Sequence, residues 1–320
     1  MNLNSKAAQR EIDERTNLTS NNKFELLLFR LGSDSGLGQS ELFGINVFKV
    51  REIVAMPPIA GGTAHSLGVA NLRGQVIPVL NLPAIMGCKP QTGLNIMLVT
   101  EYARTTQAFA VESVEDIVRL DWKQVLSAEA SGAKGKLVTS IARLDGNTDE
   151  SRLAQVLDVE AILQMVSPSD GHEVTEEKVG AKLQLKPGCI ILAADDSFVA
   201  RSLIEQELKA LAAPFEMVKS GKEAWDWLNA IARGAEAEGK TILDRVSMVL
   251  TDLEMPEMDG FTLTRNIKQD ARFQNLPVVI HSSLSGSANE DHVRSVGADG
   301  YVAKFVAEDL ADTIRRVLPH

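Results

Sequence analysis

Residues 246–260 read VSMVLTDLEMPEMDG and join a short apolar run to a segment rich in turn residues. The run at 246–250 is typical of a strand that is buried on both faces of a parallel sheet. Pro256 and Gly260 favour a tight loop between this strand and a following helix. Asp252 is therefore expected at the C-terminal end of the strand, where open α/β sheets place their ligand-binding groups.

Three further apolar runs in this half of the chain also end in polar residues. They are 190–192 with Asp195 and Asp196, 278–280 with Ser282, and 301–303 with Lys304. Because the C-terminal ends of parallel strands meet at one edge of a sheet, the carboxylates, the hydroxyl and the amine should converge there. Carboxylates and a loop carbonyl, that of Glu254, suit Mg²⁺, and the amine suits a phosphoryl oxygen. The pattern predicts a phosphoryl group on an aspartate, with Mg²⁺ as cofactor.

The chain from residue 188 onward alternates short apolar strands with longer amphipathic helices. Five strand–helix units of this kind predict a doubly wound α/β domain with a five-stranded parallel sheet. The segment 234–245 is long and polar and leaves the helix boundary before the third strand open. Helices are predicted over 198–212, 222–233, 261–270, 289–296 and 307–318.

The chain before residue 167 has a different texture, with short apolar runs separated by Gly, Pro, Asn and Asp. This spacing predicts an all-β domain, a barrel or a sandwich. The predicted domain bounds are a flexible extension over 1–22, the β-domain over 23–166, a polar linker over 167–187 and the α/β domain over 188–320.

Composition and charge narrow the function classes. The 320 residues are 44% hydrophobic and 24% charged, and the net charge is −10 without a basic run, which argues against nucleic acid or an anionic membrane as partner. The two cysteines, Cys88 and Cys189, have no metal-ligand spacing. No apolar stretch approaches the length of a membrane span, and the polar N-terminus is unlike a secretory signal. A cytoplasmic protein with no direct membrane insertion is expected.

Residues 188–318 resemble a response-regulator receiver domain of two-component signalling, on the motif residues quoted above. The resemblance implies that Asp252 accepts phosphate from a histidine kinase. Mg²⁺ would be held by Asp196, Asp252 and the Glu254 carbonyl, with Asp195 helping through water. Ser282 would be the switch hydroxyl, Lys304 a phosphoryl contact and Tyr301 the aromatic that changes rotamer on activation.

A competing interpretation is a phosphatase of the haloacid-dehalogenase type, which also forms an aspartyl phosphate. That class needs Asp-x-Asp after its first strand, whereas Asp252 opens Asp-Leu-Glu late in the fold. We therefore expect no enzyme activity beyond phosphotransfer to Asp252 and its autodephosphorylation.

Residues 24–166 resemble the CheW-type coupling domain of bacterial chemotaxis, on the stretches 43–53, 68–82 and 154–158. Asn81 stands where the family often has Asp. The resemblance implies two SH3-like β-barrels that bridge chemoreceptor cytoplasmic tips and the histidine kinase CheA. By itself, the pattern at 71–74 predicts a turn with Arg73 exposed at its tip. The residues that would contact partners are Val50, Glu52, Asn71, Arg73 and Gly74.

A coupling domain followed by a receiver is the architecture of CheV-type proteins. The expected function is an adaptor that is associated with chemoreceptor arrays and whose coupling to CheA changes when Asp252 is phosphorylated. A receiver that mainly drains phosphate from CheA is the alternative.

Overall fold

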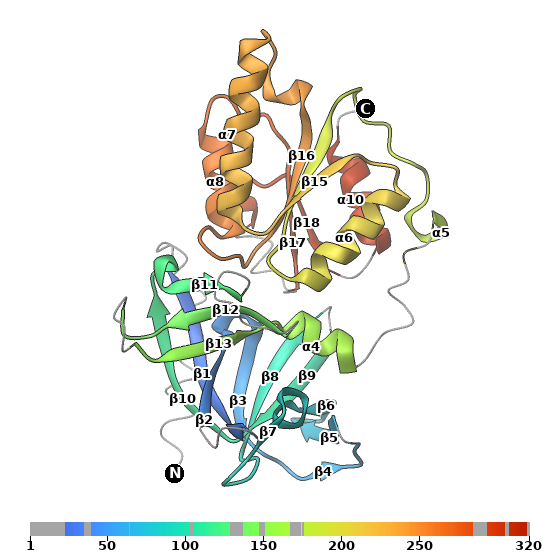
Figure 1. The fold of residues 1–320 in the computed structure, drawn as a ribbon. Coiled ribbons are helices and arrows are strands. Elements are labelled where there is room, and N and C mark those ends of the chain that lie inside the picture. Colours follow the sequence, from blue (N-terminus) through green and yellow to red (C-terminus); the bar gives the residue numbers. More distant parts are fainter. Residues whose placement is uncertain are drawn as a thin grey trace. The chain divides into compact units, whose positions relative to one another are not determined.

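The chain folds into two compact units, Met1–Pro168 and Ser169–His320, which are described here one at a time (Figure 1). The predicted extension 1–22 lies outside the described residues, as do 167–173 and 175 of the predicted linker. Among the residues described, no helix is long and apolar enough to cross a membrane. This computed structural model describes residues 23–34, 40–63, 65–102, 105–128, 137–146, 151–166, 174, 176–283, 293–304 and 307–318.

The N-terminal unit is built from two sheets, which confirms the predicted all-β class. In the first sheet the order is β10-β1-β2-β13-β12-β11 with β7 on β1, and in the second it is β3-β8-β9-β6-β5-β4. The strands are β1 (Phe24–Asp34), β2 (Ser40–Asn46), β3 (Val50–Ala55), β4 (Ile59–Ala60), β5 (Ser66–Leu72), β6 (Gln75–Asn81), β7 (Cys88–Lys89), β8 (Ile96–Tyr102), β9 (Thr105–Val111), β10 (Ser113–Leu120), β11 (Val125–Ser127), β12 (Val138–Arg143) and β13 (Leu153–Leu157). Short helices connect them: η1 (Val47–Lys49), α2 (Leu82–Met86), η2 (Trp122–Gln124) and the closing α4 (Val159–Val166).

Alternation along the strands divides this unit into three cores. In β1, Leu26 and Leu28 pack with other residues of the first sheet, whereas Leu27 and Phe29 face a core that residues of both sheets share. The second sheet has an apolar core of its own, to which β8 contributes Met97. Since successive side chains of a strand point to opposite faces, β1 is buried on both sides. Each sheet therefore encloses one core, and a third core joins the two sheets.

The C-terminal unit has a five-stranded parallel sheet in the order β15-β14-β16-β17-β18, which confirms the predicted doubly wound class. The first strand in the sequence, β14, lies inside the sheet, and the strand order reverses there, which is where open α/β sheets place their binding groups. The elements are α5 (Glu176–Val179), β14 (Ile190–Ala194), α6 (Phe198–Ala210), β15 (Phe215–Val218), α7 (Gly221–Ala237), η3 (Ile242–Asp244), β16 (Val246–Asp252), α8 (Gly260–Gln269), β17 (Val278–Ser282), β18 (Gly300–Ala303) and α10 (Ala307–Val317).

Helices cover both faces of this sheet (Figure 1). In β14, Leu192 and Ala194 pack with α7 and α8, whereas Ile191 and Ala193 pack with α6 and α10. Because both faces are apolar, the strands show continuous rather than alternating hydrophobicity, as the sequence pattern of 246–250 required.

Two details of the C-terminal unit differ from the sequence prediction. The edge strand β15 had not been singled out, because Phe215–Val218 is short and interrupted by Glu216. Helix α7 continues to Ala237, four residues beyond its predicted end, since Ala232 and Ala235 lie on its buried face. Residues 289–292, half of the predicted helix at 289–296, lie outside the described residues.

Candidate functional site

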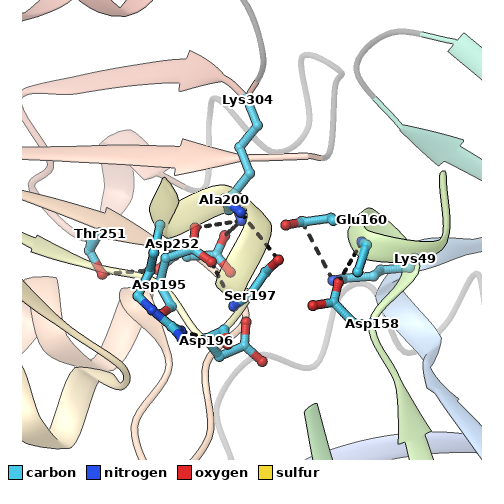
Figure 2. A network of polar contacts seen from close by, with 12 residues as sticks. Lys49, Asp158, Glu160, Asp195, Asp196, Ser197, Ala200, Thr251, Asp252 and Lys304 are labelled. Atoms are coloured by element: carbon cyan, nitrogen blue, oxygen red, sulfur yellow. Dashed lines mark hydrogen bonds and ion pairs between the residues drawn. The ribbon is translucent and has the colours of Figure 1, made fainter. Parts of the chain in front are cut away.

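The strand ends of the C-terminal unit bring three carboxylates and one ammonium together (Figure 2). Lys304 is fully buried, and its Nζ lies 2.7 Å from Asp195 Oδ2 and 3.1 Å from Asp252 Oδ1. Asp196 completes the group, since one ligand atom each from Asp195, Asp196 and Asp252 lie within 4.8 Å of one another. β14, β16 and β18 thus contribute to the same sheet edge.

The loop after Asp252 returns the chain so closely that only glycine fits at position 260. A Cβ on Gly260 would stand 2.1 Å from the Asp252 carbonyl oxygen, and the Gly260 N–H donates to Leu253 O. Glu257 adopts a φ of 65°, a region uncommon for residues other than glycine. Asp259 then caps α8 by accepting from Thr262 N–H at 2.6 Å. The Pro-x-Met-Asp-Gly segment therefore fixes the backbone beside the Asp252 carboxylate.

The turn after β14 is held by a residue that the sequence prediction missed. Arg201 Nη1 donates to the Asp195 carbonyl at 2.9 Å and to the Asp196 carbonyl at 2.8 Å. Ser197 N–H donates to Asp195 Oδ1, and the Ser197 hydroxyl oxygen accepts from Ala200 N–H as the cap of α6. A positive side chain near a helix N-terminus is unfavourable for the helix dipole. A positive charge at this position of the sequence was therefore the one signal that Arg201 has a role other than helix formation.

Ser282 lies on β17, which pairs with β16, and Tyr301 lies on β18, which pairs with β17. Ser282 is buried at the end of β17, and its carbonyl accepts from Lys304 N–H at 2.8 Å. Tyr301 is partly buried on β18, where it lines a cavity of about 380 Å³ with Arg294 and Arg316. The structure thus places both residues as the strand pattern predicted, and their switching roles stay predictions.

The charges of the acidic cluster favour a cation. Three carboxylates against the single ammonium of Lys304 leave a formal excess of two negative charges in a group of which all but Asp196 are buried. Uncompensated buried charge is costly, and hard oxygen donors at this spacing suit a small divalent cation. The residues present therefore fit Mg²⁺, with Asp195, Asp196 and Asp252 as the carboxylates and Glu254 as the predicted carbonyl donor.

Four of the five predicted partner-contact residues of the N-terminal unit lie around one β-hairpin. Arg73 and Gly74 connect β5 to β6 with φ values of 51° and 88°, as in a type I′ turn. Asn71 Oδ1 accepts from Gly74 N–H at 2.8 Å, and exposed Arg73 pairs with Glu52 of β3. Since β3 begins the strand order of this sheet and the hairpin lies near its other end, the pair joins the two ends of a strongly curled sheet.

Val50 departs from the prediction of an exposed partner-contact residue. Its side chain is 3% exposed and packs in the core that joins the two sheets. The prediction was wrong because Val50 is the first residue of β3, directly after η1, and at this position the side chain faces the core. The other four residues, Glu52, Asn71, Arg73 and Gly74, remain together around the hairpin turn.

Comparison with known proteins assigns each unit to a family. The CheW-like domain family matches residues 25–167, and the response regulator receiver domain family matches residues 191–315. Chemotaxis protein CheV2 of Helicobacter pylori is 30% identical over 97% of this chain and 99% of its own length. Chemotaxis protein CheV3 of the same organism is 29% identical over 92% of this chain and 95% of its own.

Similar solved structures cover one unit each. The scaffolding protein TtCheW of Thermoanaerobacter tengcongensis is 20% identical over 44% of this chain and 93% of its own, with a TM-score of 0.36. The receiver domain of a histidine kinase from Arabidopsis thaliana, solved with Mg²⁺ and BeF₃⁻, is 27% identical over 41% of this chain and 89% of its own, also with a TM-score of 0.36.

Proposed function

This chain belongs to the CheV-type chemotaxis proteins, and from that premise we propose that it couples chemoreceptors to the kinase CheA under control of Asp252. One observation carries the proposal: a CheW-like unit and a buried Asp–Lys site of phosphoryl-acceptor composition occur on the same chain. The first supplies a docking module and the second a chemical switch. The protein is then an adaptor of chemoreceptor arrays.

The proposed chemistry is phosphoryl transfer from a phosphohistidine of CheA to Asp252. A carboxylate oxygen of Asp252 attacks the phosphorus, the P–N bond breaks, and the imidazole leaves with the bonding electron pair. Lys304, 3.1 Å from Asp252 Oδ1, would hold one phosphoryl oxygen, and the Ser282 hydroxyl would donate to another. In-line phosphoryl transfer depends mainly on positioning and charge neutralisation, which this cluster can supply.

Mg²⁺ bound beside Asp252 would neutralise charge on the phosphoryl oxygens. Asp196 and Asp252, with the Glu254 carbonyl, would hold the ion, and Asp195 would hold one of its waters. Arg201 keeps the carbonyls of both adjacent aspartates in place, which orients the carboxylates toward the site.

Phosphorylation would act through charge. A phosphoryl group adds about −1.5 to −2 charge and three acceptor oxygens next to an ammonium already shared by two carboxylates. Lys304 and Ser282 would be drawn toward the new group; Lys304 directly follows β18, and Ser282 is the last residue of β17. Such a shift biases a packed, two-state element rather than deforming it gradually. Tyr301, three residues before Lys304, would change its rotamer with β18.

The CheW-like unit would contact its partners through the hairpin. The turn carries an exposed Arg73, held by Glu52 and by the rigid geometry of Asn71 and Gly74. A preorganised loop loses little conformational entropy on binding. Chemoreceptor tips and the regulatory domain of CheA are the proposed partners of this surface.

The test is the Asp252→Ala variant of the full chain. Phosphotransfer from CheA should fall more than about 100-fold, because the attacking carboxylate is gone, while docking to the receptor–kinase complex should persist. A radiolabel assay measures phosphotransfer, and co-sedimentation with arrays measures docking. If the variant loses phosphorylation and the kinase response to attractant is unchanged, the regulatory proposal fails and a phosphate sink explains the receiver better.

A further inference from the structure

The segment before β14 forms part of the C-terminal unit. We call residues 176–187 the strap. Its helix α5 packs against α10 and α6, and Val179 is fully buried in the core between these helices and the sheet. Leu183 and Leu185 are partly buried against the same core. The predicted linker residues 176–187 therefore cover an apolar face of the receiver.

Arg315, in the last turn of α10, holds the middle of the strap. Its Nη2 donates to the carbonyls of Val179 and, at 2.6 Å, Ala181. Gly180 between them has a φ of 72°, which turns both carbonyls within reach of one guanidinium nitrogen. Asp312 orients the same guanidinium at 3.1 Å through Nη1. The neighbouring Arg316 points elsewhere: its Nη2 donates to the Thr313 hydroxyl at 3.4 Å, on its own helix.

The C-terminal part of the strap is fixed as well. Leu183 N–H donates to the carbonyl of Leu211 at 2.8 Å, just beyond the end of α6. Lys186 forms an ion pair with Asp244 in η3, and its carbonyl accepts from Cys189 N–H. The strap is therefore bonded to α10, to the end of α6 and to η3 in turn.

The strap shares its core with the strand that leads to the phosphoryl site. Val179 belongs to the same cluster as Val302 of β18 and Leu310 of α10. Val302 is two residues before Lys304, whose ammonium lies between Asp195 and Asp252. Protein cores are close-packed, so a shift of β18 must be accommodated by the residues packed on it. A contiguous packed path therefore joins the acceptor aspartate to the strap.

We propose that the receiver face formed by α6 and α10 is a binding surface for the chain's own residues 176–187, and that phosphorylation of Asp252 weakens this contact. The strap then carries the state of the receiver to the segment that leads toward the CheW-like unit. The phosphorylation step rests on the proposed function, whereas the binding of the strap stands on its own contacts. Weakening is the expected direction because the packing described is that of the unphosphorylated chain.

Hydrogen exchange on the full chain tests this inference, in wild type, Arg315→Ala and the control Arg316→Ala. Arg315→Ala should accelerate amide exchange in 176–187 about tenfold, because two hydrogen bonds to the strap are lost. The control should leave it unchanged. Trypsin gives a second readout, since it would cut after Lys178 and Lys182 faster in Arg315→Ala, while Pro187 protects the bond after Lys186.

Adding Mg²⁺ and beryllium fluoride to wild type tests the phosphorylation step. The strap amides should exchange at least about threefold faster, and slower exchange at 252–260 reports that the site is loaded. A loaded site with unchanged strap exchange would overturn the phosphorylation step. Rapid exchange of 176–187 in untreated wild type would overturn the binding surface itself. Neither result bears on whether CheA binding changes, so the proposed function can fail or hold separately.

Discussion

Each unit contains a lysine packed among buried carboxylates, and the two arrangements differ in charge balance (Figure 2). In the receiver, Lys304 meets two carboxylates and a third lies beside them. In the CheW-like unit, Lys49 pairs with Glu160 at 3.7 Å, and Asp158 caps α4 by accepting from Ala161 N–H. The first cluster has an excess of negative charge that a cation can relieve. The second cluster is part of the N-terminal end of α4, and we interpret it as structural.

The largest expected effect comes from Lys304→Met. Removing the ammonium leaves three neighbouring carboxylates, so the receiver should lose about 3 kcal/mol of stability without metal at pH 7. Mg²⁺ should stabilise the variant more than the wild type, because the competing cation is absent. Calorimetry with and without Mg²⁺ measures both, with the CheW-like transition as internal control. If the variant were as stable as the wild type without metal, the claim that Lys304 offsets an excess of negative charge would be wrong.

Lys49→Met is the matching change in the CheW-like unit and should cost about 2 kcal/mol. Glu160 is 1% exposed and would lose its cation, which is destabilising for a buried charge. The comparison predicts no rescue by Mg²⁺, since Asp158 is engaged in capping α4 and the change leaves only the Glu160 carboxylate without its cation. Calorimetry of the CheW-like transition checks this. If Mg²⁺ restored the lost stability, both clusters would bind a cation and the proposed difference between them would be wrong.

Glu207 of α6 extends the comparison to a buried carboxyl that, among the residues that the structure describes, has no lysine beside it to balance a negative charge. Burial raises its pKa to about 8 from 4.5, and within the described part of the chain Oε2 has no hydrogen-bond partner. Between these two values the unfolded chain ionises while the folded chain keeps its proton, so receiver stability falls as pH rises. Glu207→Gln removes this loss and should stabilise the receiver by about 1–2 kcal/mol at pH 7.5.

Thermal unfolding at pH 5 and pH 7.5 measures the effect of Glu207→Gln. The gain should be much smaller at pH 5, because this pH is close to the ordinary carboxyl pKa of 4.5 and little of the ionisation penalty has built up. Glu160→Gln is the control, and it should destabilise the CheW-like unit because Glu160 has Lys49 as a partner. Equal behaviour of Glu207→Gln at both pH values would refute a raised pKa.

The smallest effect on stability is expected from Arg73→Ala in the hairpin. Arg73 is 76% exposed, and exposed ion pairs contribute little, so the change should be below about 0.5 kcal/mol. Binding to the receptor–kinase complex should nevertheless fall about tenfold. Arg119→Ala, which breaks a similar pair with Glu25 on the other sheet, is the control. Equal binding by both variants would remove the hairpin from the interface.

The convergence of Asp195, Asp252 and Lys304 was predictable because it follows from the order of strand ends in a parallel sheet. Arg201 was not found, since it acts through backbone carbonyls that no spacing rule points to. The burial of Val50 was also hidden, because its direction depends on η1 and on the packing of two sheets.

The strap was taken for a linker because its composition is polar. Val179, Leu183 and Leu185 are spaced by four and two residues, which matches neither a helix nor a strand. Their burial makes sense only against a face that α6 and α10 form together. Local patterns therefore predicted the elements and the residues at their ends, and contacts between elements distant in sequence required the structure.

The most direct test of phosphorylation-controlled coupling is the affinity of the full chain for the regulatory domain of CheA. Titration calorimetry with Mg²⁺, with and without beryllium fluoride, gives the dissociation constant in each state. A change of at least about fivefold is predicted, corresponding to roughly 1 kcal/mol of coupling between the receiver and the CheW-like unit. Equal affinity in both states, with the Asp252 site loaded, would contradict it and leave the CheW-like unit as a constitutive adaptor.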